Sequence, residues 1–408
     1  MMEKPQGAPV EGDDIFTIRI VDTIGAVAAE RWDELAAVAV DSTSANTQKT
    51  AINPFVSYAF LSSLEDSGSV GQPAGWLPQH LVLEGPGGKP IAAAPAYLKS
   101  HSQGEYVFDH GWADAFQRAG GRYYPKLQMA VPFTPASGPR LLVGGGAGAA
   151  TRRMALAEGA KSYAARTGVS SVHATFLRPD DRAAFEDADW LHRTDQQFHF
   201  HNRGYDSYEA FLGTLASRKR KALRKERTQA LVNDISIEWL TGRDLTEAVW
   251  DAFYEFYMDT GSRKWGRPYL NREFFSLVGE RMGAQILLVM AKRNGRYIAG
   301  GLNFLGPDTV YGRNWGCVED HPYLHFEVCY HQAIDYALAH GLAVVEAGAQ
   351  GEHKLARGYE PVTTHSAHWI SHPGLRRAIE DYLDHERAEV ARVGEILGGH
   401  TPYKKDAS

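Results

Sequence analysis

The segment Leu81-Val-Leu-Glu-Gly-Pro-Gly-Gly88-Lys-Pro-Ile91-Ala-Ala recurs without a gap 207 positions later, as Leu288-Val-Met-Ala-Lys-Arg-Asn-Gly295-Arg-Tyr-Ile298-Ala-Gly. Each copy places a glycine-containing turn between two apolar runs, which is typical of a β-hairpin. Because the pattern repeats over a long separation, it indicates a duplicated unit of structure. We therefore predict two related halves.

The elements that follow the hairpin also recur: an aromatic strand, a long helix closed by a glycine, and a last strand. Glycine suits the position just past a helix end because the backbone there turns left-handed. The closing glycines, Gly168 and Gly341, are 173 positions apart, so the first copy carries 34 additional residues between its third strand and its helix. The expected strands are Glu105–Trp112 and Thr309–Trp315, the helices Thr151–Thr167 and Phe326–His340, and the last strands Val169–Phe176 and Val344–Gly348.

The predicted fold class is α/β, with two mixed sheets that are each flanked by helices. We expect a disordered N-terminus at 1–14, a first domain at 15–200, a second domain at 201–400 and a tail at 401–408. An aromatic and proline-rich insertion is expected in the first domain at about 114–150, and such long loops are usually functional. Further helices are expected at Tyr208–Asn233, Leu245–Met258 and Leu375–Leu397.

The composition of the 408 residues is that of an ordinary globular protein, with 44% hydrophobic and 23% charged residues. No apolar run approaches the roughly 18 residues of a membrane span, and the polar N-terminus does not resemble a secretory signal. Only Cys317 and Cys329 occur, which excludes a disulfide framework and a four-cysteine zinc site and favours a reduced, cytoplasmic protein. The net charge of -6 argues against bulk nucleic-acid binding.

Longer motifs occur in both halves of the chain, from residue 53 to residue 361. Those of the first half are Asn53-Pro-Phe-Val-Ser57, Tyr97–Trp112 and Tyr123-Tyr-Pro-Lys126; those of the second are Tyr311–Cys317, Leu324–Glu327 and Glu346–Pro361. Together they resemble the FemAB-like N-acyltransferase family, also described as peptidoglycan biosynthesis or recognition proteins.

The resemblance implies tandem folds of the GCN5-related acetyltransferase (GNAT) type, as in the Fem aminoacyl-transferases. It also implies an N-acyltransferase or aminoacyltransferase that acylates an amine of a small or cell-wall-precursor substrate. The donor would be an acyl-CoA or an aminoacyl-tRNA, and no metal is expected. The alternative is a non-catalytic protein that keeps the fold to bind a peptidoglycan precursor or another polar ligand.

Three residues of the second half are candidates for catalysis: Glu346, Glu327 and Tyr311. Glu346 interrupts an apolar strand, where a buried carboxylate must be paired or protonated, and such a group suits a general base toward an attacking amine. The alternative is a structural ion pair, with Arg313 or Lys354 as the partner. Tyr311 and Arg313 share the strand expected to line the acyl site and are candidates for orienting the substrate.

The segment Glu352–Pro361 contributes three further binding candidates, His353, Lys354 and Arg357. It resembles the Lys-x-x-Phe-Gly segment of Fem transferases, with Arg357 where they carry an aromatic residue. Lys354 and Arg357 are three positions apart and project to one side of a helical turn, where two cations suit a phosphate or carboxylate. The alternative is a solvated helix face.

The first half offers a second group of substrate-binding candidates around its aromatic segments. Aromatic rings stack on flat or sugar-like faces, and a lysine or arginine beside them fixes an anion. The alternative is a loop that packs against the domain for structural reasons. The candidates are Asp109, His110, Trp112, Tyr124, Lys126 and Arg140.

Two segments bear on the donor. An acetyl-CoA enzyme needs a glycine-rich turn whose backbone N–H groups hold the pyrophosphate. The second copy has Cys317–Phe326 at this position, without glycine and with two acids, so we expect CoA to bind there weakly or not at all. The first copy has the glycine-rich and basic segment Gly144–Arg153, for which the alternative is a flexible loop.

The run Arg218–Arg227 contains seven cations against one acid. Such a stripe contacts RNA phosphates without reading sequence, so tRNA is a candidate partner; the alternative is a solvated helix with a buried apolar face. A metal hydrolase is a further alternative, although Pro322 interrupts the only histidine pair with zinc-helix spacing. The residues concerned are His321, His325, His331, His353 and Glu327.

Overall fold

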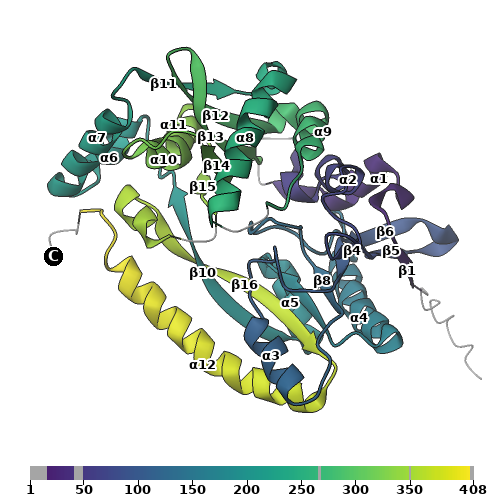
Figure 1. The fold of residues 1–408 in the computed structure, drawn as a ribbon. Helices are drawn as coiled ribbons and strands as arrows, with labels where there is room; N and C mark the ends of the chain where they lie inside the picture. Colours follow the sequence, from purple (N-terminus) through teal and green to yellow (C-terminus); the bar gives the residue numbers. More distant parts are fainter. Residues whose placement is uncertain (1–15, 41–48, 265–267, 349–350, 405–408) are drawn as a thin grey trace, which may run out of the picture.

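The structure is a computed structural model that describes residues 16–40, 49–264, 268–348 and 351–404. Its centre is an eleven-stranded mixed sheet in the order β11-β12-β13-β14-β15-β10-β16-β9-β8-β7-β4 (Figure 1). The strands, in this order, are Ile235–Leu240, Ile286–Arg293, Arg296–Leu305, Thr309–Cys317, Val344–Glu346, Leu191–His201, Glu360–Ile370, Ser171–Thr175, Lys126–Met129, Ala96–Lys99 and Trp76–Pro78. A smaller sheet joins β1 Thr17–Val21, β5 His80–Glu84 and β6 Pro90–Ala94, and a third joins β2 Val38–Val40 and β3 Lys49–Ala51.

Helices cover both faces of the large sheet. In the second half, alternate residues of β12 face opposite sides: Leu288 belongs to a core with α8 and α9, and Leu287 to a core with α11. The helices are α1 Ala29–Ala36, α2 Tyr58–Asp66, α3 His110–Arg118, α4 Ala149–Thr167, α5 Pro179–Asp187, α6 Tyr208–Gly213, α7 Ser217–Ala230, α8 Glu247–Lys264, α9 Arg272–Met282, α10 Leu324–Phe326, α11 Gln332–Ala339 and α12 Pro373–Gly398, with a π-helical turn at Glu327–His331.

The repeated segments both form antiparallel hairpins, β5–β6 and β12–β13, as the sequence predicted. The pairing that follows also recurs. β7 and β8 are antiparallel and β8 and β9 parallel in the first half; β13 and β14 are antiparallel and β14 and β15 parallel in the second. Gly168 and Gly341 close the central helices in the left-handed conformation, at φ 71° and 65°. The tandem α/β architecture is therefore confirmed.

The two halves exchange their last strands. β10, from the first half, pairs with β15 and β16, whereas β16, from the second half, pairs with β10 and β9. The long strands β10 and β16 thus join the halves into one sheet, and helix α12 lies along both of them (Figure 1). The expected domain boundary near residue 200 stays a prediction.

The prediction of a strand at Glu105–Trp112 is wrong. This segment is irregular, helix α3 begins at His110, and β8 takes the predicted place in the sheet. Gly104 and Tyr106 have φ angles of 78° and 60°, which an extended strand does not allow. The additional residues of the first half consequently lie on both sides of β8, between β7 and β8 and between β8 and α4.

The other predicted helices lie at about the expected ranges, except that one of them is divided into two. The basic segment forms α6 and α7, separated at residues 214–216, instead of one helix. In α12, Leu375, Ile379 and Leu383 recur every fourth residue and are buried, as an amphipathic helix requires. In the part of the chain that the structure describes, no helix is both long and apolar enough to cross a membrane.

Candidate functional site

The parallel strands β14 and β15 separate at the point where the second-half candidates meet. They pair over only three residues, ending at Tyr311 opposite Glu346, after which β15 stops and β14 continues to Cys317. A β-bulge in β14 leaves Arg313 without a partner on β13, and a bulge commonly redirects a side chain. We call this place, defined by Tyr311, Arg313 and Glu346, the fork.

Glu346 is buried at the fork, with 9% of its surface exposed. Its Oε1 atom lies 3.9 Å from His199 Nε2, and its Oε2 atom has no hydrogen-bond partner among the residues that the structure describes. Burial raises the pKa of the Glu346 carboxyl to about 8, although the Arg313 guanidinium, the Ser137 backbone N–H and Arg140 act to lower it. A buried carboxyl with one unpaired oxygen is suited to exchange a proton with a substrate.

Two guanidinium groups, those of Arg313 and Arg140, act on this carboxyl, and Lys354 acts on Arg313 and on His199 beside it. Arg313 donates to Phe133 O at 2.9 Å, Arg140 donates to Thr175 O at 2.9 Å and Ala136 O at 2.8 Å, and Lys354 donates to Gly348 O at 2.8 Å. Within the described ranges, no carboxylate lies within 4.0 Å of any of the three cations. Their charge is therefore available to an anionic group or to a developing negative charge in the fork.

Burial also changes the proton affinity of these cations. It lowers the pKa of Arg140 to about 10 and, with Arg313 acting in the same direction and Cys329 against it, the pKa of Lys354 to about 7. His199, beside Glu346, has its pKa lowered to about 3 by burial and by His201 and Lys354, and is neutral. The fork thus holds a protonatable acid next to a neutral imidazole and a readily deprotonated lysine.

Tyr311 is positioned from the first half of the chain. Its hydroxyl accepts a hydrogen bond from Asn53 Nδ2 at 3.1 Å, and its ring packs edge-on against Phe55 with centroids 5.1 Å apart. Burial, followed by the Glu346 charge, raises the pKa of Tyr311 well above its ordinary value. The hydroxyl therefore stays protonated and can donate a hydrogen bond.

Glu327 and Arg357, although close in sequence to the fork candidates, are held in ion pairs. Glu327 is fully buried and lies 2.8 Å from Arg227 on α7, and Gln332 also donates to it at 2.7 Å. Arg357 lies 2.7 Å from Glu226, also on α7, and stacks on Phe326. These contacts favour the structural alternative, and the catalytic role of Glu327 and the binding role of Arg357 stay predictions.

His353 is exposed, and its Nε2 lies 2.9 Å from the Tyr330 hydroxyl. Of the second-half candidates, the structure brings together Glu346, Tyr311, Arg313 and Lys354. The first-half candidate Arg140 joins them, because the segment that follows β8 crosses the sheet to reach the fork.

The other first-half candidates form a separate, buried ion cluster. Lys126 Nζ lies 2.5 Å from Asp109, 2.7 Å from Glu105 and 2.8 Å from the Ser102 hydroxyl, which is itself 2.8 Å from the Tyr124 hydroxyl. Burial alone would raise the pKa of Asp109, but Lys126 and His173 outweigh it and hold this pKa far below its ordinary value. These contacts hold the additional segment between β7 and β8 against the sheet.

Two candidates lie at the edge of this cluster. Trp112 is buried against His368, with ring centroids 5.0 Å apart, and lies under the Arg193 guanidinium. His110 is exposed and stacks on Phe108. The binding roles of Asp109, His110, Trp112, Tyr124 and Lys126 stay predictions.

Sequence reasoning missed His199 and Asn53 at the fork and Lys99 and Glu105 in the cluster. Alternation in Gln197-Phe-His199-Phe gave a signal, because one polar residue in two indicates a strand face that is not apolar. The residues that this strand face contacts could not be identified from the local sequence, because they belong to the other half of the chain. Burial raises the pKa of Glu105 to about 7 and lowers that of Lys99 to about 7.

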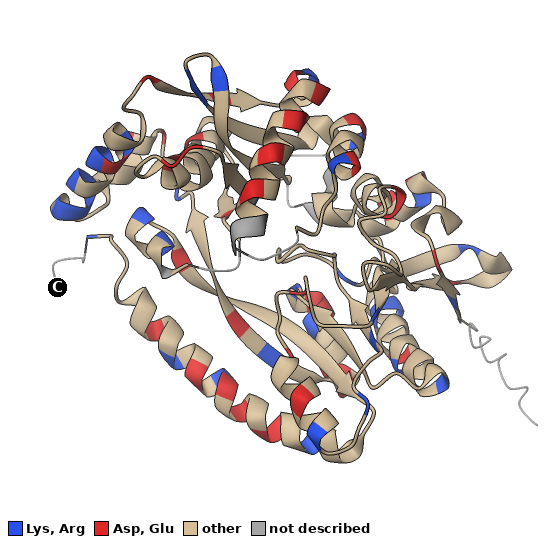
Figure 2. Ribbon diagram, viewed as in Figure 1, with Lys and Arg blue, Asp and Glu red and all other residues tan. Residues whose placement is uncertain are grey.

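Two arginines of the basic run Arg218–Arg227 form ion pairs within the protein. Arg227 pairs with Glu327 and Asp335, and Arg224 pairs with Glu209. Figure 2 shows the remaining cations gathered on α7 at one end of the molecule. The exposed ones are Arg218, Lys219, Lys221 and Lys225.

The histidines considered for a metal site do not form one cluster: His325 and His353 have ring centroids 6.5 Å apart, whereas His321 and His331 each pair with a different glutamate. His331 lies 2.8 Å from Glu226, and His321 lies 2.9 Å from Glu319. Among the residues that the structure describes, no group of three or more histidine, cysteine or acidic side chains is arranged to hold a metal ion.

The repeated topology and the fork define the class of this protein, a tandem GNAT-like α/β fold with a buried acid at a strand separation. The chain belongs to the FemAB-like family, described as peptidoglycan biosynthesis/recognition, whose sequence profile matches residues 23–405. The resemblance seen in the motifs is thereby confirmed.

Two solved structures with TM-scores of at least 0.5 agree on the fold. The crystal structure of FemX is similar with a TM-score of 0.51 at 11% identity, over 87% of this chain and 98% of that one. A conserved protein of unknown function from Bacteroides thetaiotaomicron has a TM-score of 0.50 at 13% identity, over 86% and 99%. A tandem GNAT protein from the clavulanic acid biosynthesis pathway has a TM-score of 0.43 at 14% identity, over 88% and 99%. No curated protein matches the sequence.

The buried Lys354 predicts a pH-dependent stability. At pH values between its pKa of about 7 in the folded protein and its ordinary 10.5, the Lys354 amine holds a proton in the unfolded chain but not in the folded protein. The contribution of Lys354 to the free energy of unfolding therefore rises with pH in this range and is lost as the pH falls to 7. Lys354→Met should therefore be most stabilised relative to wild type near pH 7, by an advantage that shrinks by about 1 kcal/mol per pH unit at higher pH. Denaturant unfolding of both proteins from about pH 7 to about pH 10 measures it. A difference that does not change with pH would contradict the environment described for Lys354.

Proposed function

We propose that this protein is an N-acyltransferase or aminoacyltransferase that transfers an acyl group to an amine of a small or cell-wall-precursor substrate. The observation that carries the proposal is the buried Glu346 carboxyl at the fork, with one oxygen unpaired among the described residues and with the Arg313 and Arg140 guanidinium groups acting on it. The family, with its description of peptidoglycan biosynthesis/recognition, supports a cell-wall-related substrate.

The proposed reaction forms a bond between the acceptor nitrogen and the acyl carbon, and breaks the bond between that carbon and its leaving group. The nitrogen loses a proton, which the Glu346 carboxylate accepts on Oε2. The leaving group departs with its electron pair and takes this proton from Glu346, which restores the carboxylate. Arg313 and the protonated Tyr311 are placed to stabilise negative charge on the carbonyl oxygen. Glu346 acts as a base only when ionised, so we propose that activity rises as the pH approaches 8.

The alternative is a protein that keeps this fork to bind a polar ligand without turnover. Incubation with an amine acceptor and either an acyl-CoA or an aminoacyl-tRNA, followed by mass spectrometry of the products, distinguishes the two. Formation of a new amide supports transfer. If neither donor is consumed, and the protein purified from its own host retains a polar ligand, binding is the function.

We also propose that CoA is not the donor held by the second half. The turn before α10 contains Glu319, Asp320 and Pro322, and Glu319 and Asp320 line a pocket there with Trp315 and His325. Two carboxylates oppose a diphosphate, and proline offers no N–H to hold it. Calorimetric titration with acetyl-CoA should show no binding that depends on this turn. Tight binding that is lost in Leu324→Asp and kept in Gly145→Asp would overturn this prediction.

The exposed cations of α7 support an aminoacyl-tRNA as the other donor class. Replacing Lys219, Lys221 and Lys225 together by glutamine should weaken the binding of tRNA and reduce its salt dependence. Replacing three exposed acidic residues elsewhere, Glu273, Glu280 and Glu395, provides a control of equal size. If the lysine variant binds tRNA as wild type does, or if wild type shows no salt-dependent binding, α7 is not an RNA surface.

A further inference from the structure

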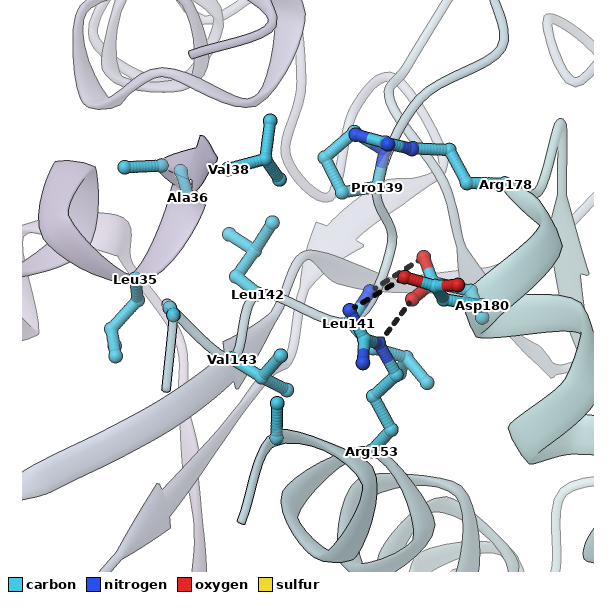
Figure 3. A pocket seen from close by; sticks show the side chains of 15 residues that line it. Leu35, Ala36, Val38, Pro139, Leu141, Leu142, Val143, Arg153, Arg178 and Asp180 are labelled. Atoms are coloured by element: carbon cyan, nitrogen blue, oxygen red, sulfur yellow. Dashed lines mark hydrogen bonds and ion pairs between the residues drawn. The ribbon is translucent and has the colours of Figure 1, made fainter. Parts of the chain in front are cut away.

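A groove in the first half, lined by none of the three residues that define the fork, has two unlike walls (Figure 3). One wall is aliphatic and comes from the end of α1, from β2 and from the segment before α4, including Leu35, Val38, Leu142 and Val143. The other wall is charged and comes from α4 and the start of α5. An apolar wall beside charged groups is the arrangement that a small-molecule site commonly shows.

The acidic groups of the charged wall already have hydrogen-bond and ion-pair partners within the protein. Asp181 accepts hydrogen bonds from the backbone N–H groups of Arg140 and Leu141, at 2.6 and 3.2 Å, and pairs with Arg153. Asp180 pairs with the same Arg153 at 3.3 Å. The charge of Arg153 is therefore compensated within the protein.

Arg178 differs from Arg153 in having no such partner. It precedes α5, is exposed, and extends toward Pro139 at the rim of the groove (Figure 3). In the described part of the chain, no carboxylate lies within 4.0 Å of its guanidinium. A second positive charge adjoins the groove at Arg152, whose guanidinium donates only to the carbonyl oxygens of residues 143, 145 and 147.

We propose that this groove binds a small amphiphilic anion, a phosphate or carboxylate carried on an aliphatic chain, with the anionic group on Arg178 and the chain against the Val38–Leu142 wall. A planar guanidinium forms paired hydrogen bonds with either anion, and the aliphatic wall removes the chain from water. Nothing in this binding requires acyl transfer at the fork, so the groove can be tested without an activity assay.

The groove also adjoins the fork through the segment that contains Pro139. Asn53, which donates to the Tyr311 hydroxyl, also donates to Ser137 O at 3.4 Å. The Arg178 charge lowers the pKa of Tyr311 against the larger raising effects of burial and Glu346.

Calorimetric titration of the full chain with octyl phosphate, octanoate, inorganic phosphate and octanol is the test. Octyl phosphate or octanoate should bind, inorganic phosphate and octanol should each bind at least tenfold more weakly, and the comparison of the first two identifies the anion. Arg178→Gln should weaken binding of the preferred amphiphile about tenfold, because a charged hydrogen-bond pair is lost. Val38→Ser should weaken the amphiphile but leave inorganic phosphate unchanged.

Arg166→Gln is the matched control, since Arg166 is an exposed arginine at the far end of α4 and does not line the groove. It should bind the amphiphile as wild type does. The proposal is overturned if no amphiphile binds, if octanol binds as well as the anions, or if Arg178→Gln and Arg166→Gln behave alike. Circular dichroism of each variant separates loss of binding from loss of folding.

Discussion

Glu346→Gln is expected to lower the rate of amide formation by about 10²- to 10⁴-fold, the usual contribution of a positioned general base. Glutamine has the same shape but accepts no proton, so the fork should keep its packing while losing the acid-base step. The Glu346 carboxyl has an Oε2 atom that is unpaired among the described residues and little access to water, so this oxygen is the proton acceptor that the substitution removes. Initial rates with whichever donor is consumed, measured at several pH values, provide the check.

Glu238→Gln is the control, because Glu238 is also a strand glutamate but lies on the edge strand β11, paired with Lys292. Its rate should equal that of wild type. If Glu346→Gln retains full activity as a folded protein, Glu346 is not the base. If both variants lose activity equally, the effect has no specific origin at the fork.

Lys126→Met is expected to reduce the free energy of unfolding by about 3–5 kcal/mol, the cost typical of removing one partner from a buried ion pair. Lys126 is fully buried, and its removal leaves Glu105 and Asp109 without the cation that lies within 2.7 Å of both. Lys99 cannot replace it, since it is 3.7 Å from Glu105 and is held over Trp76. Denaturant unfolding monitored by tryptophan fluorescence measures the change.

Lys161→Met on α4 is the matched control, because Lys161 is partly exposed and pairs with the exposed Glu158, and it should change stability by no more than about 1 kcal/mol. Adding Glu105→Gln to Lys126→Met should restore part of the loss, because one unpaired carboxylate is then removed. Equal stability of Lys126→Met and Lys161→Met would mean that the cluster does not hold the insertion on the sheet. It would then favour the predicted role in substrate binding.

The sequence predicted those features that depend on neighbours along the chain. The hairpins follow from apolar runs around Gly88 and Gly295, and the helix ends from Gly168 and Gly341, because turns and caps are local. The same local reading misassigned Glu105–Trp112 as a strand. Its aromatic residues suit a strand, but Glu105 and Asp109 pair instead with Lys126, about twenty residues away.

The composition of the fork depended on contacts that no local pattern encodes. Glu346 was identified because a carboxylate on an apolar strand is unusual. His199 and Arg140, which complete its surroundings, come from the first half of the chain, and the exchange of β10 and β16 brings His199 beside Glu346. Glu327 shows the opposite case: its sequence neighbourhood suggested catalysis, whereas Arg227 on the preceding basic helix supplies a structural partner.

We infer that the fork holds Glu346 as a protonated acid that ionises near pH 8. Difference infrared spectroscopy between wild type and Glu346→Gln, recorded across this pH range, observes the carboxyl directly and needs no substrate. We expect a protonated-carboxyl band at pH 7 that is absent from the variant and disappears from wild type with a midpoint of about 8. A carboxyl already ionised at pH 7, with a midpoint near its ordinary 4.5, would contradict it.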